Sequence, residues 1–165
     1  MNEEVLRSIR AVHKLFGEKG LTLAIAESCT GGLLSHFMTM LPGSSSFFQA
    51  GLVTYSNASK LSILGLAPAT IETYGVISET AAREMAEKVR ALLKTDYALA
   101  TTGNLGPEVL EGKKRGLVYI AVSTEGKTIV KELQLSCGRS ANKEKASYFA
   151  MQFLLEAARE EMRSF

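Results

Sequence analysis

The stretch LTLAIAESCTGG, residues 21–32, joins a short apolar run to a glycine-rich turn. The apolar run 21–26 has the length and composition of a buried strand. The turn Thr30–Gly32 leads into a segment of helical pattern that ends before Pro42, because proline interrupts a helix. Strands that pass through short turns into helices are typical of α/β domains, in which ligand sites form at the carboxyl edge of the sheet.

Outward from this stretch, segments of helical periodicity alternate with strand-like runs, and the chain then forms a hairpin before its last helix. The expected helices are 3–19, a short one that Asn57 caps and Gly65 closes, one from Ser78 or Thr80 to Lys94, and one from about Ser140 to Met162. The expected further strands are 47–55, 97–102, 116–124 and 128–136. We interpret 68–75 as a connector with room for one short helix and 108–115 as a charged, exposed loop. This order predicts one domain, residues 1–165, with three layers and a mostly parallel sheet that includes at least one antiparallel strand.

The composition narrows the class of protein. The 165 residues are 46% hydrophobic and carry a net charge of +2, which excludes a disordered chain and disfavours a dedicated nucleic-acid binder. Two cysteines are too few for a disulfide framework or a zinc site and suit a reducing cytoplasm. The N-terminus lacks the apolar core of a signal peptide, and Pro42 and Gly43 interrupt the longest uncharged stretch. We therefore expect a soluble cytoplasmic domain that binds neither a membrane nor a metal ion.

Ser28 lies in the first glycine-rich turn and is a candidate nucleophile. Glycines let the backbone approach a ligand, and the free N–H groups of the following helix attract negative charge. The alternative is that Ser28 or Thr30 only caps this helix, which is a common role for these residue types. The residues alone leave both interpretations open.

A nucleophilic serine needs a base, and the two histidines are poorly placed to act as one. His13 lies inside the first helix, and His36 is about 12 Å along a helix from Ser28. Lys60 follows a strand end among apolar neighbours, so burial could lower its pKa toward neutrality, and Tyr55 could relay the proton. A solvated surface lysine is the ordinary alternative for Lys60.

Two further features could contribute to a site. Cys29 is a competing nucleophile, although a buried and inert thiol is the commoner case. The second glycine-rich turn, TGNLGP at 102–107, again offers backbone donors after a strand, but it matches neither the dinucleotide fingerprint nor a phosphate-binding loop. Arg139 could hold an anionic group, or it could simply be an exposed arginine.

Four runs resemble the CinA C-terminal domain family. They are AESCTGG at 26–32, GSSSFFQAGLVTYSNASK at 43–60, YGVISE at 74–79 and TGNLGP at 102–107. The resemblance extends from about Glu4 to the last helix, and it is to the stand-alone form without the usual amino-terminal domain. The family's characterised enzymes are nicotinamide-nucleotide amidases, also called nicotinamide mononucleotide deamidases.

This resemblance implies an α/β fold, a three-layer α/β/α sandwich with a mixed, mostly parallel sheet, and a cytoplasmic homodimer. It implies hydrolysis of nicotinamide mononucleotide to nicotinic acid mononucleotide and ammonia, in pyridine nucleotide recycling, without metal or cofactor. Carried over to this chain, the nucleophile is Ser28, and Tyr55 and Lys60 handle the proton. Oxyanion donors would come from Thr30, Gly31 and Gly32, whereas the substrate would be held by Ser45, Thr102, Gly103 and Arg139.

Two segments depart from the family pattern. TGNLGP stands where the family usually has TGIAGP, and it continues into the charged run 108–115. CGR stands where the family has GDR, so that Gly138 replaces the usual aspartate. These departures motivate a second hypothesis, a catalytically weak or inactive relative that binds a pyridine or related nucleotide without turnover.

Overall fold

The computed structural model of the chain describes residues 2–165 and contains one five-stranded sheet. The sheet order is β2-β1-β3-β4-β5, with β1 at Leu23–Glu27, β2 at Phe48–Val53, β3 at Tyr97–Gly103, β4 at Leu117–Thr124 and β5 at Lys127–Gln134. Strands β2, β1 and β3 run parallel, whereas β4 and β5 form an antiparallel hairpin beside β3. The predicted mixed sheet is confirmed, and its parallel part consists of β2, β1 and β3.

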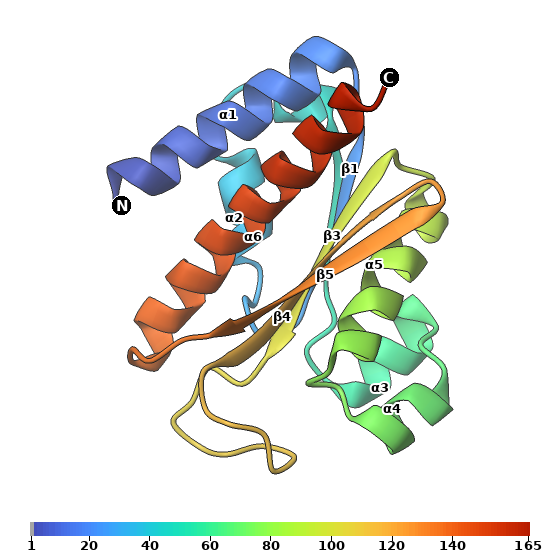
Figure 1. The fold of residues 1–165 in the computed structure, drawn as a ribbon, viewed down its shortest axis with the longest axis vertical. Coiled ribbons are helices and arrows are strands. Elements are labelled where there is room, and N and C mark those ends of the chain that lie inside the picture. Colours follow the sequence, from blue (N-terminus) through green and yellow to red (C-terminus); the bar gives the residue numbers. More distant parts are fainter. Residues whose placement is uncertain (1) are drawn as a thin grey trace.

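Helices cover both faces of this sheet (Figure 1). On one face lie α1 (Glu3–Lys19), α2 (Leu33–Thr39) and α6 (Arg139–Arg163); on the other lie α3 (Asn57–Ser59), α4 (Pro68–Tyr74) and α5 (Glu79–Leu93). A single helical turn, η1 (Ser44–Ser46), precedes β2, and a second, η2 (Lys60–Leu64), continues α3. The three-layer α/β/α arrangement is therefore confirmed. No helix within residues 2–165 has both the length and the apolarity needed to cross a membrane.

The alternation of side chains along the central strands produces the two cores. Leu23 and Ile25 of β1 join the larger buried cluster with residues of α1 and α6. Ala24 and Ala26 point to the opposite face and pack with α5, because successive side chains of a strand alternate between faces. The small alanines on that face leave room for helix α5 to lie close against the sheet.

One local expectation needs correction, and another is confirmed. The cap of the short helix is Ser56, whose hydroxyl accepts from the Ser59 N–H, and Asn57 is instead the first helical residue. A serine hydroxyl reaches the backbone of the third residue of a helix well, which explains the shift by one position. The 68–75 connector does contain a helix, α4, which begins with Pro68.

Candidate active site

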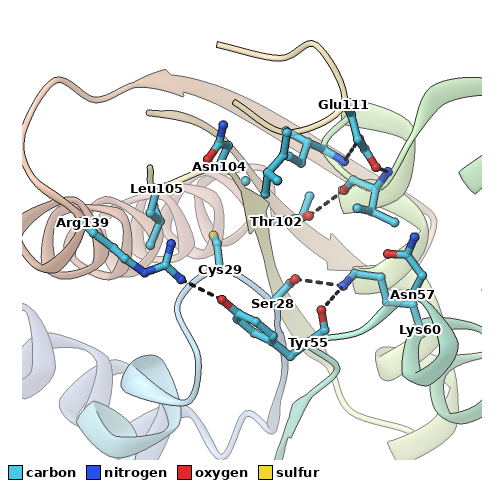
Figure 2. Close-up of a pocket in the computed structure, with 14 residues that line it drawn as sticks. Ser28, Cys29, Tyr55, Asn57, Lys60, Thr102, Asn104, Leu105, Glu111 and Arg139 are labelled. Atoms are coloured by element: carbon cyan, nitrogen blue, oxygen red, sulfur yellow. Dashed lines mark hydrogen bonds between the residues drawn. The ribbon is translucent and has the colours of Figure 1, made fainter. Parts of the chain in front are cut away.

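The carboxyl ends of the three parallel strands meet at a pocket of about 280 Å³ (Figure 2). Ser28 directly follows β1, and Tyr55 lies two residues beyond β2. The ladders continue into these segments, since the Ser28 N–H donates to the Thr101 carbonyl and the Thr54 N–H to the Glu27 carbonyl. Parallel strands that end at one edge of the sheet thus bring together segments that are distant in sequence.

Lys60 points at Ser28 from beneath the pocket. Its Nζ lies 2.9 Å from Ser28 Oγ, 2.7 Å from the carbonyl oxygen of Thr54 and 3.3 Å from that of Tyr55. The two side chains that the sequence suggested as nucleophile and base therefore lie within hydrogen-bond distance of each other. The two carbonyls fix the amine, so its remaining hydrogen-bonding direction faces the serine.

Burial of Lys60 shifts the protonation equilibrium of its side chain toward the neutral amine. The residue is only 1% exposed and forms no ion pair among residues 2–165. Burial lowers the pKa of Lys60 from 10.5 to about 8, although the Glu111 carboxylate favours the charged form and opposes the shift. A base with a pKa near ambient pH is suited to general base catalysis.

Lys60 reaches this position because a helical segment starts immediately after β2. Its backbone N–H donates to the Ser56 carbonyl, four residues earlier, and η2 then widens into a π-helical turn. Gly65 ends this turn with a φ of 73°, which glycine adopts without strain. Single π-turns are frequent at functional sites, where they alter the direction of a side chain.

Glu27 organises the turn that carries Ser28, and its role was not predicted from the sequence. Its fully buried carboxylate accepts five hydrogen bonds, from the Thr30 hydroxyl, the N–H groups of Gly32, Leu34 and Ser35, and the Ser35 hydroxyl. A carboxylate at the N-terminus of a helix also interacts favourably with the helix dipole. An acidic residue at the end of a buried strand, followed by Gly-Gly, is the sequence signal that could have identified it.

Two of the three backbone donors expected in the serine turn, residues 28–32, are already engaged within the chain. The Gly31 N–H donates to the Ser28 carbonyl, and the Gly32 N–H is bound by Glu27. The Thr30 hydroxyl contacts Glu27 and Thr101. Within residues 2–165, the N–H groups of Cys29 and Thr30 have no hydrogen-bond partner. Of these two residues only Cys29 lines the pocket, whereas Thr30 is fully buried, so the Cys29 N–H is the donor of this turn that faces the site.

The Tyr55 hydroxyl lies beside Arg139 and not beside Lys60 (Figure 2). Arg139 donates to this hydroxyl at 2.7 Å and to the carbonyl oxygen of Gly106 at 2.7 Å. Only the main-chain carbonyl of Tyr55 contacts Lys60, and the residue is 58% exposed. The expectation that Tyr55 and Lys60 share a proton through the phenol is not met, because the ring turns outward from a segment that leaves the sheet edge.

The second glycine-rich turn forms the opposite wall of the pocket. Thr102 and Gly103 both line it, and the Thr102 hydroxyl donates to the Val76 carbonyl at 2.6 Å. Asn104 is buried and fixes the turn, since its amide donates to the Glu108 carbonyl and its oxygen accepts from the Gly106 N–H. The sequence pattern, weak by itself, does mark part of the site.

The charged run 108–115 is exposed, as predicted, but it also contributes to the pocket, and we call it the strap. Leu110 and Lys113 form a bridge around a turn at Glu111 and Gly112, and Leu110 and Glu111 line the pocket. The Glu111 carboxylate accepts the N–H groups of Val76 and Ile77 at 3.0 and 3.2 Å. None of these pocket residues of the strap was predicted from the sequence.

A family model for the CinA C-terminal domain matches residues 6–158. This chain belongs to the CinA C-terminal domain family. It is 49% identical over 129 residues to a protein of Caldanaerobacter subterraneus named as competence-damage inducible, a match that covers 78% of this chain and 31% of the relative. A relative of Alkaliphilus oremlandii with the same name is 46% identical over 144 residues, covering 87% of this chain and 35% of that protein. The chain thus spans about a third of the length of these curated relatives.

Solved structures support the same family assignment. The crystal structure of a competence or damage-inducible protein from Enterobacter asburiae superposes with a TM-score of 0.91 at 33% identity, covering 95% of this chain and 99% of that one. A CinA superfamily protein from Klebsiella pneumoniae gives a TM-score of 0.92 at 28% identity, covering 97% and 99%. The resemblance inferred from the four sequence runs, and the fold that it implies, are confirmed.

Two other expected residues of this CinA-family domain can now be placed. Ser45 lies in η1, before β2 begins, whereas the pocket lies beyond the ends of the strands. Its predicted contact with substrate in the same chain is therefore wrong, because η1 and the pocket are at opposite edges of the sheet. Cys29 lines the pocket, but burial raises the pKa of its thiol to about 12, which disfavours the nucleophilic thiolate.

Proposed function

We propose that this CinA-family domain is an amidohydrolase that converts nicotinamide mononucleotide to nicotinic acid mononucleotide and ammonia. The observation that carries the proposal is the 2.9 Å contact between Lys60 Nζ and Ser28 Oγ in a pocket at the carboxyl edge of the sheet. The family resemblance supplies the substrate. The relatives' names supply no activity, so the reaction is our inference from the site and from that resemblance.

In the proposed reaction, neutral Lys60 accepts the proton of Ser28 as Oγ attacks the carboxamide carbon. The resulting oxyanion accepts a hydrogen bond from the N–H group of Cys29, which lines the pocket. Donation from the residue after the nucleophile is a recurring oxyanion arrangement in serine hydrolases. Such preorganised donors contribute several kcal/mol to transition-state stabilisation.

Protonated Lys60 then donates its proton to the leaving nitrogen, so that ammonia departs and an ester to Ser28 remains. Water attacks this ester and gives a proton to Lys60. As the second tetrahedral intermediate collapses, Lys60 returns a proton to Ser28 Oγ and the carboxylic acid product leaves. In each half-reaction the amine acts first as a base and then as an acid, which requires a pKa near neutrality.

Purified protein should release ammonia from nicotinamide mononucleotide. Ser28→Ala and Lys60→Met should each lower kcat by at least about a thousandfold, because removal of either member of a nucleophile–base pair disables both. Lys131→Met is a matched control, since Lys131 is a surface lysine paired with Glu156. Full activity in Ser28→Ala would overturn the mechanism.

The same assay decides the competing function, a nucleotide-binding relative without turnover. The altered strap and Gly138, which caps α6 without a side-chain hydrogen bond, favour that alternative. It predicts saturable binding of a pyridine nucleotide with no ammonia release even at high protein concentration. Homodimerisation and a cytoplasmic location remain predictions from the resemblance, and sedimentation velocity would measure the former.

A further inference from the structure

The pocket has opposite charges at its two ends. Figure 2 shows Arg139 and Glu111 on opposite sides of the site, with Thr102 and Leu105 between them. Arg139 extends from the first residue of α6, and Glu111 stands at the turn of the strap. A ligand complementary to this pocket has an anionic group at one end and a cationic centre at the other.

The strap holds the Glu111 carboxylate in a fixed place. Glu111 has a φ of 53° and is followed by Gly112 at 66°, which tightens the turn and directs the side chain toward the segment before α5. There the carboxylate accepts the two N–H groups of Val76 and Ile77. Lys113 adds a third contact, from its Nζ to the Tyr74 carbonyl at 3.3 Å.

The charge on Glu111 is not neutralised by a basic side chain. Within residues 2–165, the ion pairs are Arg7–Glu3, Arg83–Glu79 and Lys131–Glu156, and none includes Glu111. Backbone N–H groups stabilise a carboxylate without cancelling its charge. The field of Glu111 also reaches the catalytic pair, since it favours the charged form of Lys60 and so acts to raise its pKa.

We propose that Glu111 selects substrates whose reacting carboxamide is carried by a positively charged ring. The inference rests on the proposed function and refines it, because the pyridinium ring of nicotinamide mononucleotide is cationic and its phosphate is anionic. With the carboxamide at Ser28, the ring occupies the Glu111 side of the pocket and the anionic group extends toward Arg139. The reduced nucleotide has the same carboxamide, ribose and phosphate but a neutral ring, so it gains nothing from Glu111.

A binding experiment with this pair of nucleotides isolates the charge of the ring. Dissociation constants of oxidised and reduced nicotinamide mononucleotide are measured by calorimetry on Ser28→Ala, which prevents turnover, with and without Glu111→Gln. Glutamine keeps the shape of the side chain and one acceptor for the Val76 or Ile77 N–H. Glu108→Gln removes the same charge from the same strap at a side chain that does not line the pocket, and it is the matched control.

Glu111→Gln should weaken binding of the oxidised nucleotide about tenfold, equivalent to about 1.4 kcal/mol, and change binding of the reduced nucleotide less than twofold. Glu108→Gln should leave both constants within twofold. An equal loss of affinity for both nucleotides would show that Glu111 has only a structural role. That result, or no loss of affinity for either nucleotide, would overturn this inference and leave the proposed function standing. Failure of Ser28→Ala to bind either nucleotide would overturn the proposed function together with it.

Discussion

Two glutamates hold backbone N–H groups beside the pocket, and they differ in burial. Glu27 is fully buried and accepts five hydrogen bonds, whereas Glu111 lies on the exposed strap and accepts two. Glu27 shapes the turn that carries Ser28, and Glu111 shapes the wall that faces the substrate. The proposed chemistry thus depends on a buried carboxylate with many hydrogen bonds, and the proposed selectivity depends on a carboxylate of an exposed loop.

Replacing each carboxylate by its amide tests this difference directly. Glu27→Gln should lower the free energy of unfolding by about 3 kcal/mol, because the amide nitrogen faces donors that then lose their acceptor. Glu111→Gln should cost less than about 1 kcal/mol, since water can replace its partners. Urea denaturation monitored by circular dichroism measures both free energies of unfolding. Equal losses in the two variants would show that the difference in burial between Glu27 and Glu111 does not affect stability.

Lys60 provides a second test, through pH. Its folded pKa of about 8 lies below the ordinary 10.5, so between these values the unfolded chain binds more protons and stability rises with pH. The stability of the wild type relative to Lys60→Met should therefore increase by about 3 kcal/mol between pH 7.5 and 10.5. Parallel urea titrations of the two proteins across this range provide the measurement.

The pH dependence of activity should report the same titration of Lys60 in the folded protein. Because the reaction requires the neutral amine, kcat/KM should rise with pH and level off above an apparent pKa near 8. Arginine cannot lose its proton in this range, so Lys60→Arg should show no such rise. A flat profile in the wild-type protein would exclude Lys60 as the base that titrates.

The pocket wall and the strap also differ in how closely their glycines are packed. A Cβ on Gly103 would lie 2.7 Å from the Leu117 carbonyl oxygen, whereas Gly112 has nothing within 4 Å of that position. Gly103→Ala should cost about 3 kcal/mol, because backbone must move in a close-packed region. Gly112→Ala should cost about 1 kcal/mol, from its positive φ alone. Thermal unfolding of the two variants ranks them.

The sequence was sufficient to find the two members of the proposed catalytic pair, because each residue follows a parallel strand. Ser28 comes after β1 and Lys60 shortly after β2, and the directions of the strands bring both to one edge. The elimination of both histidines then left a lysine as the base. The same argument, applied strictly, would have excluded Ser45, which precedes its strand and so lies at the other edge.

The rest of the site depends on contacts that no local pattern encodes. The side chain of Tyr55 could have turned either way, and the position of Arg139 on α6, 84 residues later, decides its partner. The Glu111 contact joins the strap to residues 34 and 35 positions earlier. The composition of the strap suggests only a solvated loop. Its charge does not reveal which segment of the chain its turn contacts.

The two cysteines supply the prediction with the smallest effect on function. Burial raises the pKa of Cys29 to about 12, whereas Cys137 is partly exposed with Lys145 Nζ 3.0 Å from its sulfur. Iodoacetamide at pH 8 should therefore alkylate Cys137 and leave Cys29 unmodified, since only the thiolate reacts. Ammonia release should stay within twofold, because Cys137 does not line the pocket. Peptide mass spectrometry locates the label. Labelling at Cys29 with loss of activity would mean that the serine turn opens in solution far more than the burial of Cys29 indicates.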